Sequence, residues 1–156
     1  MEPAWGASWA WGLSLITLTT AVHAFGVVMI FRGLRRSGQI GRVRERHVRH
    51  PIALAGALIA VVVLLLTMLH GIETGIWAAA YLAVGAIGSE REAMLYSLDS
   101  FTTRGASDVL LGPKWQLLGA LEAADGMLLF GISTAFIFAV FQRIVGLMDQ
   151  DKSSHR

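Results

Sequence analysis

The chain contains no cysteine and few charged residues. The missing cysteine excludes a disulfide scaffold, a thiolate zinc site, an iron–sulfur cluster and a cysteine nucleophile. Charged residues make up only 15% of the 156 positions, whereas an ordinary soluble domain has about 25%. Hydrophobic residues make up 54%, which is more apolar surface than a soluble core of this size can bury. The composition therefore predicts an all-α membrane protein.

Three apolar runs are long enough to cross a bilayer, whose hydrocarbon core of about 30 Å needs roughly 20 helical residues. The first run extends from Trp11 to Leu34 and the third from Trp115 to Ile144. The second, Ile52 to Ile87, would measure roughly 54 Å as one helix. We therefore expect three transmembrane helices, the second of which tilts, protrudes or breaks near Gly71 or Gly75.

Basic residues are concentrated in the segment from Arg32 to Arg49, where the first run ends and the connection to the second follows. It holds seven of the thirteen Lys and Arg residues, namely Arg32, Arg35, Arg36, Arg42, Arg44, Arg46 and Arg49. Short basic loops stay in the cytoplasm, so we expect residues 1–34 to begin outside the inner (plasma) membrane, 35–50 to form a cytoplasmic loop and 147–156 a cytoplasmic tail. Anionic lipid is an expected partner at 32–50. Nucleic acid is not an expected partner, because the orientation of the chain in the membrane already explains the arginines.

A short helix is predicted between the second and third runs. Ser89 and Glu92 fit the S-x-x-E capping box, which places a helix start at Glu90 and an end near Phe101. A helix of that length cannot cross a bilayer, yet it is too apolar for a solvated loop. A helix that enters the membrane and returns as irregular backbone is tolerated only where protein surrounds it or where it lines a water-filled path.

The segment from Leu95 to Asp108, LYSLDSFTTRGASD, resembles the pore helix and filter of the potassium-channel superfamily, whose pattern is Y-F/S-x-x-x-T/S-x-T-T-V/L-G-Y-G-D. The resemblance covers roughly Leu64 to Arg143. It implies a homotetrameric ion channel in which residues 51–146 form a two-helix pore module, and in which 89–113 hold a re-entrant pore helix and a filter-like loop around a pathway for an inorganic ion. The filter-like positions are Thr102, Thr103, Arg104, Gly105, Ala106, Ser107 and Asp108.

Three residues depart from the filter pattern, in which backbone carbonyls replace the water shell of the ion. Arg104 stands at the Val position, Ala106 at Tyr and Ser107 at the second Gly. Serine reaches the glycine conformation only at about 1 kcal/mol or more. We therefore expect no strong potassium selectivity.

Arg104 also needs an acidic partner, because an uncompensated charge away from water is strongly unfavourable. We expect Asp99 first, then Glu122 and then Asp125, as charges that support the filter. Two alternatives to a pathway supported by a paired Arg104 remain open. Arg104 faces the pathway, where a ring of arginines favours anions, or the chain forms a non-conducting assembly of the same fold.

The third run contains candidates for a gate. Gly126 and Gly131 are candidate hinges, as glycines on the inner helix are in the family that the chain resembles. Phe138 and Phe141 are candidates for a hydrophobic constriction that dewets. Helix packing is the simpler role for at least one of the two glycines, and an aromatic residue at helical spacing more often lies in the core or faces lipid.

His23, His70 and Glu73 lie within the apolar runs and allow a different class of function. Two histidines on separate helices can ligate a haem, and an H-x-x-E spacing can bind a metal. Hydrogen-bonded histidines that pack helices are the favoured interpretation, so we expect no metal and no cofactor. The sequence has no P-loop, no G-x-S-x-G and no H-E-x-x-H motif, so no enzymatic activity is expected.

Overall fold

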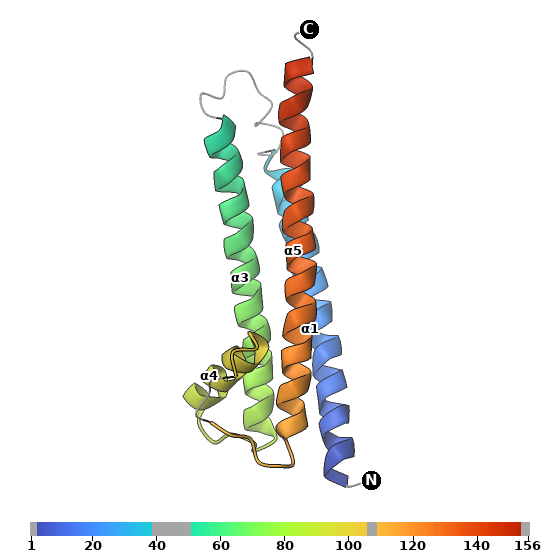
Figure 1. Cartoon of the computed structure of the whole chain (residues 1–156), viewed down its shortest axis with the longest axis vertical. Helices are drawn as coiled ribbons and strands as arrows, with labels where there is room; N and C mark the ends of the chain where they lie inside the picture. Colours follow the sequence, from blue (N-terminus) through green and yellow to red (C-terminus); the bar gives the residue numbers. More distant parts are fainter. Residues whose placement is uncertain (1–2, 39–50, 106–108, 154–156) are drawn as a thin grey trace. The chain divides into compact units, whose positions relative to one another are not determined.

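The computed structural model describes the backbone of residues 3–38, 51–105 and 109–153. Within these ranges the chain is all-helical (Figure 1). The helices are α1 (Pro3–Arg36), α3 (Pro51–Ala83), α4 (Glu90–Phe101) and α5 (Gln116–Ser153). Two compact units are present, one made of residues 1–24 and 69–131 and the other of 25–68 and 132–156. The three long helices each contribute to both units.

The three long helices contain the candidate membrane spans, Gly6–Arg36, Ile52–Ala83 and Gln116–Leu147. Each span has 31 or 32 residues, more than the roughly 20 that a bilayer requires. A helix of this length in a bilayer would tilt or protrude from it. Large apolar side chains such as Phe25 and Leu128 stay exposed on the single chain, as expected for a surface that meets lipid. The prediction of an all-helical chain with three helices long and apolar enough to cross a membrane is confirmed.

Helix α3 is continuous through Gly71 and Gly75 and ends at Ala83. Its end is a Schellman turn, in which Gly85 has a positive φ of 67°. The Gly85 amide donates to the Leu82 carbonyl (3.0 Å) and the Ala86 amide to the Tyr81 carbonyl (2.9 Å). Glycine takes this conformation without steric strain. The helix therefore stops four residues before the apolar run does.

Helix α4 begins and ends where the sequence predicts. Ser89 is its N-cap in extended conformation, and the Ser89 side chain accepts a hydrogen bond from the Glu92 amide. The helix covers Glu90–Phe101, only 12 residues, or about 18 Å. It is too short to cross a bilayer, as predicted.

The first unit has a core of aromatic and leucine side chains drawn from all four helices. The largest members with almost no exposed surface are Trp77, Tyr81, Phe101, Leu118 and Leu129. Leu15 contributes from α1. The Ser8 hydroxyl donates to the Lys114 carbonyl at 2.7 Å. The start of α1 is thereby attached to the segment that precedes α5.

The second unit buries aliphatic side chains of α3 and α5, among them Leu58, Val62, Leu66, Val140 and Ile144. It also has a groove of about 580 Å³ between α1 and α5, lined by Phe31, Leu34, Arg35, Gly38, Ala139, Arg143 and Leu147. Arg32, Arg35 and Arg36 are exposed at the end of α1. The other arginines of the basic segment lie outside the described residues, namely Arg42, Arg44, Arg46 and Arg49, as do residues 154–156 of the predicted tail.

Candidate functional site

Helix α4 is fixed to its neighbours α3 and α5 by two serine side chains. The Ser97 hydroxyl contacts the Thr74 carbonyl oxygen of α3 at 2.7 Å. One turn later, the Ser100 hydroxyl donates to the Gly119 carbonyl of α5 at 2.8 Å. The Tyr96 ring packs edge-on against Tyr81 with a centroid separation of 5.1 Å. Figure 1 shows α4 beside the C-terminal part of α3, where these contacts hold it.

Glu122 is fully buried beside α4 and has two polar partners. The Tyr81 hydroxyl donates to Glu122 Oε2 at 2.7 Å, and Ser97 Oγ lies in hydrogen-bond contact with Glu122 Oε1. Ser97 has a single hydroxyl proton, and the Thr74 carbonyl can only accept one. If Ser97 donates to that carbonyl, its contact with Glu122 needs a proton on the carboxyl group. The contacts are therefore all satisfied when Glu122 is a neutral acid that donates to Ser97.

Asp125 is also fully buried, one helical turn after Glu122. Its Oδ2 atom accepts from the Thr19 hydroxyl of α1 at 2.7 Å and from the Trp77 indole of α3 at 3.0 Å. Its Oδ1 atom has no hydrogen-bond partner among the described residues. An unsatisfied buried carboxylate oxygen is unfavourable, so Asp125 carries an electrostatic cost in the first unit.

His23, His70 and Glu73 form a cluster between α1 and α3. His23 Nδ1 lies 2.8 Å from Glu73 Oε1, and His70 Nδ1 lies 2.9 Å from Glu73 Oε2. The two imidazole rings stack at 5.2 Å with an interplanar angle of 27°. Axial haem ligation needs two rings that point edge-on at an iron between them. Stacked rings whose Nδ1 atoms both face one carboxylate do not fit that arrangement.

The backbone after α4 turns back over Asp99. The Thr103 amide donates to the Ser100 carbonyl (2.9 Å) and the Arg104 amide to the Asp99 carbonyl (2.8 Å). This is a second Schellman turn, in which Thr103 occupies the glycine position with φ of 57°. A β-branched residue rarely adopts that conformation. The turn places the side chain of Arg104 beside that of Asp99.

Arg104 and Asp99 form a two-pronged ion pair. Arg104 Nε lies 2.7 Å from Asp99 Oδ1, and the Arg104 terminal nitrogen Nη2 donates to Asp99 Oδ2 at 3.2 Å. The sequence predicts this pairing ahead of the pairings with Glu122 and Asp125, which bind hydroxyl and indole donors instead. On the single chain the Arg104 side chain is 65% exposed and that of Asp99 is 12% exposed.

Thr102, Thr103, Arg104 and Gly105 of the predicted loop are described and exposed. Gly105 has a positive φ of 62°, so two residues of this short segment adopt left-handed backbone conformations. Ala106, Ser107 and Asp108 lie outside the described residues. The filter-like role expected of these three residues therefore stays a prediction.

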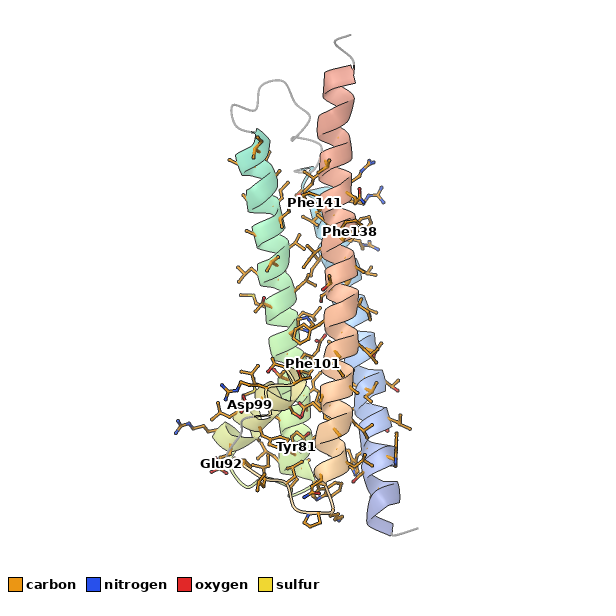
Figure 2. All side chains as sticks on the ribbon, in the orientation of Figure 1. Tyr81, Glu92, Asp99, Phe101, Phe138 and Phe141 are labelled. Atoms are coloured by element: carbon orange, nitrogen blue, oxygen red, sulfur yellow. The ribbon has the colours of Figure 1, made fainter. Side chains whose placement is uncertain are left out.

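The candidate hinges and gate residues on α5 occupy different environments. Gly126 is buried, and a Cβ atom there would overlap the Phe101 carbonyl of α4, whereas no neighbouring atom lies within 4 Å of a Cβ built at Gly131. Helix α5 continues through both glycines. Phe138 and Phe141 extend from α5 in the second unit and are exposed (Figure 2). Close packing accounts for Gly126.

Tyr96 on α4 has an electrostatically perturbed hydroxyl group. Burial raises the pKa of Tyr96 above its ordinary value of 10.0. Tyr96 therefore stays a neutral hydrogen-bonding group at physiological pH.

The partners of the buried acids are the residues that sequence reasoning missed. Tyr81 and Trp77 stand four residues apart on one face of α3, and Glu122 and Asp125 stand three apart on one face of α5. Such spacings place polar groups on the same side of a helix. The sequence signal that could have identified these partners is the recurrence, at helical spacing, of side chains with a polar end in two otherwise apolar runs.

Comparison with protein-family models, with curated proteins and with solved structures finds no significant match to this chain.

Proposed function

We propose that the chain is the subunit of a tetrameric ion channel, in which α4 is a re-entrant pore helix and residues 102–108 are a filter-like loop. The observation that carries the proposal is the anchoring of α4. Its 12 residues are too few to cross a bilayer, it is attached to two membrane-spanning helices, and irregular backbone follows it. Protein must surround such a segment in a membrane, and a closed ring of subunits does so most simply.

The loop supports conduction without strong potassium selectivity. The Arg104 guanidinium is paired with Asp99, so its charge is partly neutralised where the loop begins. This pairing favours a weakly selective cation pathway over an anion ring. The carbonyl spacing of a potassium filter requires glycine where this chain has Ser107.

The proposed orientation places the N-terminus outside and the basic segment in the cytoplasm of the inner membrane. Arg35 and Arg143 stand beside the apolar groove of the second unit. A phospholipid with an anionic headgroup suits this combination, since its phosphate pairs with arginine and its acyl chain covers the apolar lining. Anionic lipid is thus a proposed partner, together with the permeant ion.

The test is current recording from purified protein in planar bilayers, with potassium on one side and sodium on the other. We expect currents that reverse close to zero voltage. A large shift toward the potassium equilibrium potential would contradict the weak selectivity. A reversal that follows chloride in a salt gradient would identify an anion channel, and protein that gives no current would indicate a non-conducting assembly.

Native mass measurement of the detergent-extracted protein tests the assembly. A mass of four chains is expected. A dimer or trimer would remove the ring of re-entrant loops on which the proposal depends.

A further inference from the structure

We propose that His23, His70 and Glu73 form a binding site for a divalent transition-metal ion of the zinc class. The potential ligand atoms of these residues all lie within 4.8 Å of one another. They come from α1 and α3, so the site joins residues that are 50 positions apart in the chain. Two imidazole nitrogens with one carboxylate make a donor set that selects zinc and neighbouring first-row metals over magnesium or calcium.

The present spacing is close to that of a metal-bound site. Zinc–nitrogen and zinc–oxygen bonds of about 2.0–2.2 Å in a tetrahedral site separate neighbouring donors by about 3.3 Å. The nitrogen–oxygen separations here are 2.8 Å and 2.9 Å. The ligand atoms all lie within 4.8 Å of one another, so side-chain movements of about 1.5 Å or less would bring every pair of donors to the tetrahedral separation. Any proton that now bridges an imidazole and Glu73 would be released to solvent as the ion binds.

The charge balance of the first unit favours a divalent cation. Glu73, Glu122 and Asp125 are fully buried, and no Lys or Arg is buried among the described residues. The contacts of Glu122 are satisfied by a proton on its own carboxyl group. Asp125 interacts electrostatically with both Glu73 and His23, and its Oδ1 atom is buried without a partner. One divalent ion beside two neutral histidines would compensate the remaining two carboxylates.

The surroundings provide a shielded site with one accessible side. His23 and Glu73 are completely buried, whereas the His70 side chain is 12% exposed. The rings of Phe101 and Phe130 lie 5.7 Å and 4.5 Å from the His70 ring. An apolar shell of this kind limits water access to a bound metal. The ion would enter on the His70 side, near the end of α4.

The site does not depend on ion conduction, so its test uses binding alone. The full chain is purified into lipid nanodiscs, treated with a chelator and equilibrated with Zn²⁺. Metal analysis should find about one zinc per chain, because each chain supplies one such donor set. Glu73→Gln and His70→Ala should each weaken binding by about 100-fold or more, a loss at or beyond that of residues that only orient ligands. The matched controls, Glu90→Gln and His155→Ala, should bind as the unchanged chain does.

X-ray absorption of the zinc-loaded, unaltered chain keeps the test decisive if a variant fails to fold. The expected spectrum shows two imidazole nitrogens among the nearest neighbours of the ion. A spectrum with oxygen ligands only would overturn the proposal. So would binding that persists equally in Glu73→Gln and His70→Ala, or the absence of stoichiometric zinc on the unchanged chain.

Discussion

The hydroxyl group of Tyr81 on α3 donates a hydrogen bond to the buried carboxyl group of Glu122 on α5 at 2.7 Å. This contact joins α3 to α5, and Tyr81 lies close to α4 (Figure 2). It also belongs to a chain of hydrogen bonds that continues through Ser97 to the backbone of α3. The buried acid is therefore a structural connector between three helices.

Removing the hydroxyl group of Tyr81 should destabilise the first unit. Tyr81→Phe leaves one buried oxygen of Glu122 without its donor, which reduces the free energy of unfolding by about 1–3 kcal/mol. Equilibrium unfolding in mixed detergent micelles measures the change. Tyr96→Phe serves as the comparison, because Tyr96 is only half-buried, and its loss should be smaller. Equal losses of stability in the two variants would contradict a stabilising hydrogen bond between Tyr81 and Glu122.

Glu122→Gln should be tolerated far better than Glu122→Ala. A glutamine side chain donates from its amide to Ser97 and accepts from Tyr81, as a protonated carboxyl group does. Alanine instead leaves a cavity and breaks both bonds, with an expected loss of several kcal/mol. The unfolding free energies of the two variants are compared directly. A glutamine variant as unstable as the alanine variant would show that Glu122 is ionised in the native chain.

The ion pair between Asp99 and Arg104 should contribute only modestly to the free energy of unfolding. The guanidinium group is 65% exposed, so solvent screens the pair and a double-mutant cycle should give a coupling of about 0.2–1 kcal/mol. The cycle uses Asp99→Val, Arg104→Leu and the double variant, with Arg91→Leu as a control for loss of an exposed charge on α4. Additive effects on unfolding would argue that the pair contributes nothing. A change in the sign of the permeant ion in Arg104→Leu would favour the anion-ring alternative.

Substitution of the two α5 glycines should have opposite effects. A Cβ atom at Gly126 would overlap the Phe101 backbone, and such overpacking typically costs 1–3 kcal/mol. At Gly131 there is open space, so Gly131→Ala should gain up to about 1 kcal/mol of helix propensity. Thermal unfolding of the two alanine variants measures both. Similar behaviour at the two positions would contradict the close contact between α4 and α5.

Two neighbouring threonines offer a test of backbone strain. Thr103 has a φ of 57°, and a left-handed conformation costs a residue with a side chain about 1–2 kcal/mol. Thr103→Gly should therefore raise stability. Thr102 has a φ of −85°, and Thr102→Gly should lower stability, because it adds chain entropy without relieving strain. Equal and negative effects would show that Thr103 is unstrained.

The sequence predicts α4 well because its signals are local. The Ser89 cap and the five-residue spacing between Asp99 and Arg104 lie within or beside one short helix, so pattern and structure coincide. The Tyr81–Glu122 bond could not be predicted, because 41 positions separate the two residues and their meeting depends on how two helices are rotated. The same holds for Asp125 with Thr19. The turn at Gly85 could not be predicted from the apolar run, because hydrophobicity continues past the residue at which the helix ends.

The acids on α5 also have a consequence for biosynthesis. An aspartate at the centre of an inserting helix adds roughly 2.5–3.5 kcal/mol to the free energy of membrane insertion. Helix α5 carries Glu122 and Asp125 in the first third of its candidate span, Gln116–Leu147, where the cost has the same sign and a smaller size. Among the described residues, the side chains that hydrogen-bond to these two acids lie earlier in the chain, including Thr19, Trp77, Tyr81 and Ser97. A ribosome delivers the donors before the acids. These hydrogen-bond donors are therefore already synthesised when α5 leaves the translocon. Insertion of α5 is expected to depend on α1 and α3 being in place.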